Sequence, residues 1–441
     1  MSHLFHRPVI RVGVMSAEEV RFHLHGEFSC PLTTRGKATG EHCLQHRDGY
    51  VTDALSGKRY DELLFVPEHD TCSVEIQKVT IGIDFHWERT ETQTFAGSLH
   101  VIVDGGKLLV INIIDAEEYL QSVISSEMRA TASPEFLKTH AVISRSWLMA
   151  QMEKQRAQSA KKTCESCIRT DTEWIQWSDR EDHTLFDVCA DDHCQRYQGT
   201  TRIVSPAVKE AVEATCGIIL SYGGKICDAR FSKCCGGVTE TFENTWEPVV
   251  HPYLTRVSDG HAPLNTDLTD ETQAREWILA SPPAFCHTSD KTILEQTLNR
   301  YDMETSHFFR WKASYGQNEL SELVAARSGI DFGRIIDLVP VERGVSGRII
   351  RLRIEGERRS MVIGKELLIR RCLSSSHLYS SAFVVDRETG TGGTSFTLHG
   401  AGWGHGVGLC QIGAAVMCGQ GFTYRQVLSR YYPGSIPEKR Y

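Results

Sequence analysis

Short apolar runs broken by Gly, Asp and Ser dominate the first hundred residues, and this pattern is typical of β-strands. Such runs lie at 9–14, 19–24, 60–65, 79–83 and 97–103. A further apolar run at 107–114 is separated from the fifth by Asp104-Gly105-Gly106, and this spacing predicts a β-hairpin. The N-terminal part of the chain is therefore expected to be rich in β-structure.

Helical patterns replace the strands from residue 115 onward. Asp115 followed by Glu118 predicts the start of a short helix, whose apolar pattern continues to residue 124. Pro134 fits the first position of a longer helix that runs to about residue 154. Further helices are expected at 206–215, 271–279, 292–301, 319–326, 407–417 and 423–431, and strands at 335–341 and 349–354.

These elements predict a mixed α+β fold. We expect a β-rich N-terminal region, a helical middle, and C-terminal strands whose two closing helices form a cleft with the central helix. The corresponding regions are a β-rich part at 1–105, a core with a Cys/His segment at 106–260, a helical part at 261–345, and a strand and helix part with a glycine-rich motif at 346–441.

The composition is that of a soluble globular protein, since 41% of the 441 residues are hydrophobic and 24% are charged. The net charge of −8 argues against a nucleic-acid-binding protein, which usually carries a basic surplus. Neither a secretion signal nor a transmembrane segment is predicted, because the N-terminus lacks a basic stretch with a long apolar run and no apolar stretch could span a bilayer. The 15 cysteines do not suggest a paired framework, so mostly reduced thiols are expected.

Four acidic residues precede the long helix, and one of them differs from the others. Asp115, Glu117 and Glu118 lie in a first helical turn, where capping and the helix dipole favour carboxylates. Glu127 follows an apolar run and precedes the turn-prone segment 130–134, so no cap or helical partner accounts for it. Partial burial would raise its pKa toward the range of a general acid/base, although the pattern also fits a solvated loop glutamate.

Arg145 is the second unusual charge, because it lies within the apolar run 141–149 of the long helix. An arginine in such a place usually extends its charged end to solvent or pairs with a carboxylate. A functional interpretation directs Arg145 at Glu127 or at an anionic part of a substrate.

The segment after the long helix could bind a metal ion. His183, Cys189, His193 and Cys194 offer two imidazoles and two thiolates, a set that suits tetrahedral Zn²⁺. A second possibility combines the C-x-x-C pair at 164–167 with Cys189 and Cys194 in a four-thiolate zinc site. Disulfide pairing or unconnected thiols would explain the same residues without a metal.

The glycine-rich stretch at 400–421 lacks the spacing of a dinucleotide-binding turn, and the chain contains no GxxxxGK[ST] motif, so no nucleotide cofactor is expected. A tight backbone turn that presents His405 and the start of a helix near Gly408 is one interpretation. A turn packed only for structure is the other.

These segments together resemble the SpoIID/LytB family of stage II sporulation protein D and the amidase enhancers. The matching stretches are AEEYLQSVISSEM at 116–128, PEFLKTHAVISRSW at 134–147, YQG at 197–199, ARFSKCCGGVTETFENTW at 229–246, PYLTRV at 252–257, FRWKASYGQNELSELV at 309–324 and GWGHGVGLCQIGAAVMCGQGFTYRQVLSRYYPG at 402–434.

The resemblance implies a peptidoglycan lytic transglycosylase that cleaves the MurNAc–GlcNAc bond of peptide-free glycan strands and leaves 1,6-anhydro-MurNAc ends. Glu127 is then implied as the catalytic acid/base, and Arg145 as the residue that orients it or binds substrate. One carboxyl group suffices, because the C6 hydroxyl of the sugar can act as the nucleophile.

The glycine-rich motif is implied to bind substrate through His405, Gln411, Gly404 and Gly406. Because some members of the family carry a zinc ion held by paired Cys and His, the resemblance favours the mixed Cys/His set over the four-thiolate one. The alternative function is that of a non-catalytic, peptidoglycan-binding enhancer of a cell-wall amidase.

Three positions depart from the family pattern. Arg129 replaces the usual proline, Trp147 replaces a tyrosine, and Phe231-Ser-Lys-Cys-Cys-Gly-Gly replaces a motif with His and Ser. These changes imply a retuned substrate cleft or a weaker activity. The cysteine usage and the missing signal suggest a reducing cell interior, whereas the resemblance suggests the cell envelope.

Overall fold

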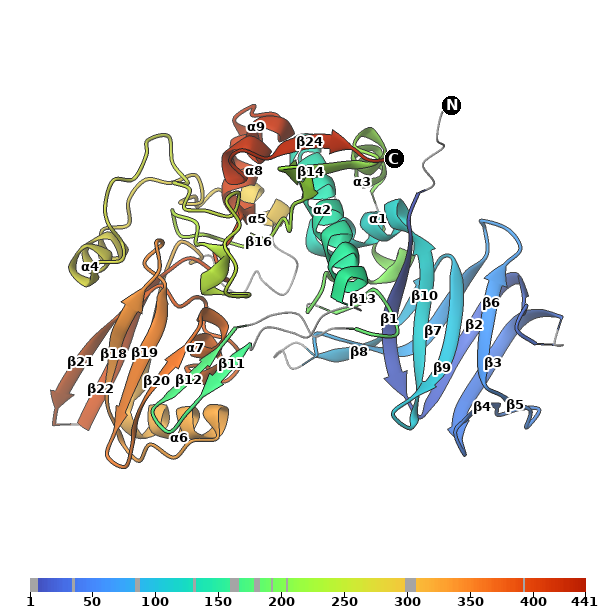
Figure 1. Ribbon diagram of the computed structural model, residues 1–441, viewed down its shortest axis with the longest axis horizontal. Helices are drawn as coiled ribbons and strands as arrows, with labels where there is room; N and C mark the ends of the chain where they lie inside the picture. Colours follow the sequence, from blue (N-terminus) through green and yellow to red (C-terminus); the bar gives the residue numbers. More distant parts are fainter. Residues whose placement is uncertain are drawn as a thin grey trace.

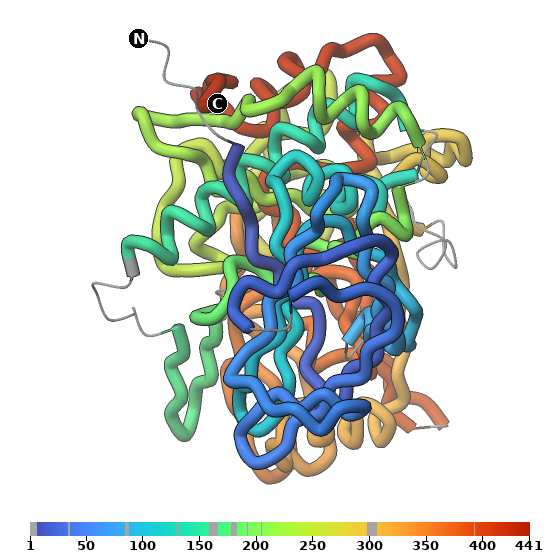
Figure 2. Tube along the Cα trace, turned by 90° about the vertical axis from the view of Figure 1, so that its right-hand side faces the viewer, coloured from blue at the N-terminus to red at the C-terminus, as the bar shows by residue number. Residues whose placement is uncertain are grey.

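The computed structural model describes residues 7–33, 36–83, 88–129, 132–158, 166–177, 183–191, 193–203, 205–297, 307–391 and 393–441. The fold is mixed α+β, as predicted. Figure 1 shows two β-rich ends on either side of a group of helices. Figure 2 gives the view along the long axis, with the N-terminal strands in front of the C-terminal ones.

The N-terminal end is one large antiparallel sheet, to which a short later strand adds a parallel edge. The described strands in order β13-β1-β10-β9-β6-β2-β3-β4-β5 are joined by β7 and β8, which branch from β2. The predicted hairpin is confirmed as β9 and β10, with Asp104 opposite Lys107. The bounds are β1 Val9–Ala17, β2 Glu19–Ser29, β3 Lys37–Arg47, β4 Tyr50–Asp53, β5 Arg59–Tyr60, β6 Glu62–Pro67, β7 Ser73–Ile81, β8 Arg89–Phe95, β9 Ser98–Asp104, β10 Lys107–Asp115 and β13 Val188–Cys189.

Helices fill the centre of the molecule around α2, which packs against α1, α3, α8 and α9 (Figure 1). Ala141, Ile143 and Leu148 of α2 are fully buried, because the middle of this helix is covered on several sides. The bounds are α1 Ala116–Glu127, α2 Pro134–Gln158, α3 Pro206–Ala214, α8 Gln411–Gly419, α9 Tyr424–Tyr431, β14 Ile218–Tyr222, β15 Lys225–Ile226, β16 Phe231–Ser232, β23 Leu409–Cys410, β24 Ile436–Lys439, and the 3₁₀ turns Gly199–Arg202 and Phe242–Asn244.

The C-terminal end combines a sheet of β11, β12, β20, β19 and β18 with a second sheet of β17, β22 and β21. The β11–β12 hairpin comes from the middle of the sequence and pairs through β12 with β20 (Figure 1). The bounds are β11 Cys167–Arg169, β12 Glu173–Gln176, α4 Glu271–Ala280, α5 Lys291–Thr297, β17 Arg310–Gly316, α6 Gln317–Ser328, β18 Ile335–Arg343, β19 Ile349–Gly356, β20 Ser360–Gly364, α7 Glu366–Cys372, β21 Phe383–Gly390 and β22 Gly393–Ala401.

One expected helix differs from the structure, and another can be compared only over its first part. The helix expected at 407–417 begins at Gln411 instead, because residues 409–410 form β23 and pair with β16. The helix expected at 292–301 is confirmed as α5 up to Thr297, and its last residues lie outside the described part of the chain. None of the helices among the described residues has the length and apolar character that a bilayer span requires.

Candidate functional site

Helix α1 carries Glu127 as its last residue. Asp115 caps the helix, accepting hydrogen bonds from the backbone N–H groups of Glu117 and Glu118, which confirms the predicted start. The helix runs three residues further than expected, because Met128 is 4% exposed and packs in the main core. Glu127 is therefore held at the end of a packed helix rather than in a solvated loop.

Three segments of the chain meet around Glu127, whose side chain is partly buried. The N–H of Arg129 donates to the carbonyl of Gln296 at the end of α5, 3.2 Å away. Tyr119, two turns before Glu127, is fully buried, and burial raises its pKa, with further contributions from Cys194, Cys189 and Glu127. Glu127 is thus close enough to Tyr119 to influence its pKa, as are Cys189 and Cys194 of the Cys/His segment. A carboxylate at the C-terminal end of a helix is disfavoured by the helix dipole.

Arg145 pairs with Glu117, and this corrects the expected pairing with Glu127. Its Nε and Nη2 atoms lie 2.7 and 2.6 Å from the two carboxylate oxygens of Glu117. Its Nη1 donates to the carbonyls of Ala141 and Ile218. The side chain of Arg145 is 0% exposed, so it touches no solvent-accessible substrate site. The physical reason is that Glu117 lies on the inner face of α1, where a buried carboxylate needs a bidentate cation.

Glu117 therefore has a structural role beyond its favourable charge in the first turn of α1. Besides Arg145, its carboxylate accepts hydrogen bonds from the Tyr441 hydroxyl at 2.7 Å and from the Gly217 N–H at 3.4 Å. The pair joins α1 to α2 and to the strand β14. Arg145 can therefore position Glu127 only through the placement of α1.

His405 uses both ring nitrogens within the fold. Its Nε2 donates to the carbonyl of Phe231 at 2.9 Å, and its Nδ1 accepts from the N–H of Val407 at 3.0 Å. Burial, together with the charges of Arg230 and Arg348 among others, lowers the pKa of His405 well below its usual value. The neutral ring ties the glycine-rich turn to β16, which leaves no ring nitrogen for substrate.

One glycine of the turn makes room for a buried arginine. A Cβ on Gly406, whose φ is +75°, would lie 2.3 Å from Cζ of Arg348. Arg348 is fully buried and donates to the carbonyls of Gly404 and Cys235. Gly406 thus permits the close approach of Arg348, whereas a Cβ on Gly404 would lie 3.2 Å from Cβ of Ser232.

Gln411 differs from its neighbours because its polar end is not satisfied. The side chain is 2% exposed, and its Nε2 has no hydrogen-bond partner among the described residues. The same holds for Nε2 of His140 on α2 and for Oγ of Ser232 on β16. Buried polar groups are nearly always paired, so three unpaired ones in neighbouring elements mark a place for a polar ligand or water.

These elements lie close together and next to the end of α5. Phe231 packs edge-on against the His140 ring, with ring centroids 5.2 Å apart, and Ser232 pairs with Cys410 in the β16–β23 ladder. Lys233 donates from Nζ to the carbonyl of Thr297 at 2.9 Å. Because Gln296 contacts the segment after Glu127, the two consecutive residues at the end of α5 connect Glu127's segment with that of Ser232.

The structure brings the four expected metal ligands together. The ligand atoms of His183, Cys189, His193 and Cys194 all lie within 4.8 Å of one another. Sγ of Cys194 is 3.5 Å from Nε2 of His183 and 3.7 Å from Nδ1 of His193, and Sγ of Cys189 is 3.9 Å from the same Nδ1. A tetrahedral zinc ion separates S and N ligands by about 3.6 Å, so the donor set fits this ion.

Two further features suit thiolate ligands at this group. The N–H of Cys189 donates to Sγ of Cys194 at 3.4 Å. Interactions with Cys194, followed by those with His183 and His193, lower the pKa of the Cys189 thiol despite its burial. In the four-thiolate alternative, Cys164 lies outside the described residues, and Cys167 is exposed on β11 and outside this group.

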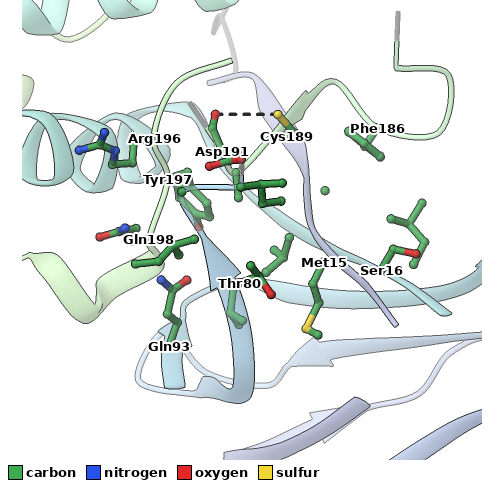
Figure 3. A pocket seen from close by; sticks show the side chains of 18 residues that line it. Met15, Ser16, Thr80, Gln93, Phe186, Cys189, Asp191, Arg196, Tyr197 and Gln198 are labelled. Carbon is green, nitrogen blue, oxygen red and sulfur yellow. Dashed lines mark hydrogen bonds between the residues drawn. The ribbon is translucent and has the colours of Figure 1, made fainter. Parts of the chain in front are cut away.

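A pocket of about 190 Å³ lies beside this group, between the large sheet and the Cys/His segment. Figure 3 shows Met15, Thr80 and Gln93 of the sheet among the side chains that line this pocket, together with Cys189 and Tyr197. Tyr197 stacks on Tyr119, with ring centroids 5.1 Å apart. The pocket is therefore one residue layer away from the helix that carries Glu127.

Sequence reasoning missed several residues of this region. Glu117 could have been recognised, because it shares a helical face with Leu120 and Ile124, which predicts an inward direction. His140 lies in the apolar run of α2 and had the same signal. Arg348 could not be found, because it comes from β-structure far away in the sequence and gives no local pattern.

Two family models match parts of the chain. Residues 104–222 match the family model described as stage II sporulation protein, and residues 240–408 match a domain of unknown function, DUF8618. The chain is 25% identical to stage II sporulation protein D of Bacillus amyloliquefaciens over 321 residues, which cover 73% of each chain. It is 25% identical to the protein of the same name from Bacillus subtilis (strain 168) over 323 residues, covering 73% of this chain and 74% of the relative.

A third relative is the amidase enhancer of Bacillus subtilis (strain 168), 24% identical over 250 residues. This match covers 51% of the present chain and 32% of the relative. The SpoIID family, whose model matches residues 104–222, is cell-wall related. The matches support the resemblance to the SpoIID/LytB family, with a SpoIID domain at residues 104–222.

Proposed function

We propose that this chain is a peptidoglycan lytic transglycosylase that cleaves the MurNAc–GlcNAc bond in peptide-free glycan strands. The observation that carries the proposal is the position of Glu127. Its partly buried carboxyl group ends helix α1 within the matched SpoIID domain, where the helix dipole disfavours a negative charge. A carboxyl group kept in such a place suits a group that exchanges a proton with a substrate.

The reaction needs one carboxyl group. Glu127 first donates its proton to the glycosidic oxygen of the leaving sugar and then removes the proton from the C6 hydroxyl of the MurNAc ring. The C6 oxygen attacks C1 of the same ring, and the 1,6-anhydro end forms without an activated water or a second carboxylate. Arg145 acts as a positioning residue, because its bond to Glu117 fixes the helix that ends at Glu127.

Substrate hydroxyl or amide groups would be bound through ordered water by unpaired buried atoms, because these atoms are shielded from bulk solvent. Nε2 of Gln411, Nε2 of His140 and Oγ of Ser232 supply hydrogen-bonding groups without a protein partner among the described residues. His405 with Gly404 and Gly406 would support this set by fixing the turn that precedes Gln411.

His183, Cys189, His193 and Cys194 would hold a zinc ion. Four protein ligands fill a tetrahedral shell, which is typical of structural zinc sites. The ion would fix the segment that ends at Tyr197, and Tyr197 in turn packs on Tyr119 of α1. No proton transfer at Glu127 depends on it.

The test incubates the purified chain with peptide-free glycan strands and looks for 1,6-anhydro-MurNAc ends by mass spectrometry. We expect these ends with the wild type, and at least a 100-fold lower rate with Glu127→Gln, as for loss of a general acid/base. Glu118→Gln is the matched control, since it makes the same change at an exposed site on the same helix. Equal rates for the wild type and Glu127→Gln, or no anhydro ends with either, would refute the proposal.

The second candidate is a non-catalytic enhancer of a cell-wall amidase, and the match to the amidase enhancer favours it. In that case the chain yields no anhydro ends but binds glycan strands and accelerates stem-peptide removal by an added cell-wall amidase. Glu127→Gln would then stimulate the amidase as well as the wild type does.

A further inference from the structure

A second group of thiols lies deep in the core. Cys235 follows β16, Cys286 lies before α5, and Cys410 ends β23 at the start of α8. Together with Asp259 they place four ligand atoms within 4.8 Å of one another. The sulfur atoms of Cys235 and Cys286 are 3.8 Å apart. Chain segments separated by up to 175 residues thus converge on one point.

All four side chains are shielded from solvent, with exposures of 0% for Asp259 and Cys410, 1% for Cys235 and 2% for Cys286. Asp259 forms no ion pair with a cationic side chain in the described part of the chain. Burying a carboxylate without a nearby positive charge costs several kcal/mol, unless the group is neutralised or binds a metal. A divalent cation between the sulfur atoms and Asp259 would compensate this charge.

Hydrogen bonds from backbone N–H groups and from the Tyr431 hydroxyl orient the ligand atoms. The N–H of Cys235 donates to Sγ of Cys410 at 3.2 Å, and the N–H of Gly237 donates to Sγ of Cys235 at 3.4 Å. Asp259 accepts from the N–H of Cys286 at 2.8 Å and from the hydroxyl of Tyr431. Such bonds to the ligands are the usual outer shell of a metal centre.

We propose that Cys235, Asp259, Cys286 and Cys410 bind a structural zinc ion. Three thiolates and one carboxylate give a closed four-coordinate set, and zinc favours thiolates in tetrahedral geometry. A disulfide would bring two sulfur atoms to about 2.05 Å and leave Asp259 and the third thiol without a partner for their charge. The proposal is independent of the proposed function and of the His183 group.

The ion would fix the part of the fold that holds Ser232 and Gln411. Arg348 donates hydrogen bonds to the carbonyl of Cys235 and to the carbonyl of Gly404. Cys410 directly precedes Gln411. Zinc bound here would therefore set the position of the glycine-rich turn relative to β16.

Metal analysis of the full-length chain tests the site. We expect Cys286→Ser and Asp259→Asn each to lose one zinc ion per chain relative to the wild type. Cys372→Ser is the matched control, because Cys372 is also a fully buried thiol but packs in the C-terminal core. Unchanged zinc in Cys286→Ser would overturn the proposal.

Cys234 supplies a second comparison, since its thiol interacts with those of Cys286 and Cys410. We expect Cys234→Ser to keep the ion. If Cys234→Ser loses it while Asp259→Asn keeps it, the assigned ligand set is wrong. Iron with sulfide in place of zinc, or a disulfide between any of these cysteines found by non-reducing mass spectrometry, would also overturn the proposal.

A spectroscopic measurement covers the case in which the core variants do not fold. X-ray absorption at the zinc edge is measured on Cys189→Ser/Cys194→Ser, which keeps the core group intact and disables the other one. We expect zinc with three sulfur neighbours and one oxygen neighbour, following the ligands of the core group. A zinc-free protein, or zinc with two sulfur and two nitrogen neighbours, would contradict the proposal.

Discussion

The buried pair of Arg145 and Glu117 should carry a large part of the stability of the central helices. Arg145→Met removes the guanidinium and keeps a side chain of similar length. Glu117, which is 3% exposed, is then left with the hydroxyl of Tyr441 and the N–H of Gly217 as its hydrogen-bond donors. The variant therefore measures the free energy of a buried carboxylate that has lost its cation.

The structure sets the magnitude of this effect. Both side chains are buried and joined by two hydrogen bonds of 2.7 and 2.6 Å, so breaking the pair should lower the free energy of unfolding by about 3–5 kcal/mol. This is roughly a third of the stability of a typical domain or more. Glu117→Leu/Arg145→Met removes both charges, and we expect it to be more stable than Arg145→Met alone, because no unpaired buried charge remains.

Urea unfolding followed by circular dichroism measures these differences as shifts of the transition. Arg334→Met is the matched control, because Arg334 also donates two hydrogen bonds to a glutamate, Glu357, but at the surface. That variant should lose much less stability than Arg145→Met, because water screens the exposed pair. The reasoning is refuted if Arg145→Met loses no more than Arg334→Met, or if the double variant is less stable than Arg145→Met.

Two further predictions concern His140 and Gly199. Burial lowers the pKa of His140 to about 3, so the unfolded chain binds a proton between about pH 6.5 and 3 that the folded chain does not, and stability falls as the pH drops. His140→Gln should reduce the pH slope of the unfolding free energy by about 1.4 kcal/mol per pH unit in this window. Urea titrations at several pH values measure this slope, and an unchanged slope would contradict the prediction. Gly199→Ala should be at least about 2 kcal/mol less stable than Gly223→Ala in thermal unfolding. Both glycines have a positive φ, but only at Gly199 would the added Cβ meet a backbone oxygen, that of Thr94, at 2.1 Å. Equal losses would show that the contact does not matter.

Local signals were sufficient for much of the fold. Asp115 could be recognised as a helix cap because the residues whose N–H groups it binds follow directly in the sequence. The β9–β10 hairpin followed from a two-residue turn between apolar runs. The group of His183 and Cys194 was found because its ligands lie on one short segment.

Features that depend on distant segments could not be predicted. Arg145 looked like a partner for Glu127, because nothing in the local pattern shows which carboxylate faces a helix 28 residues later. The core thiol group combines Cys235 and Cys410, and no spacing rule connects residues so far apart. His405 looked exposed among glycines, yet a side chain on the neighbouring Gly406 would collide with the buried Arg348.

The short strand β13 also protects an edge of the large sheet. Strand β1 pairs with β10 on one side, and on the other side its partner is β13, through Val12 with Val188 and Gly13 with Cys189. If β13 detaches, the N–H and C=O groups of β1 become available for pairing with another chain. Conditions that loosen the Cys189 segment, such as thiol oxidation during purification, should therefore promote self-association through the β1 edge. Handling of the cysteines thus bears on the colloidal behaviour of the protein as well as on its chemistry.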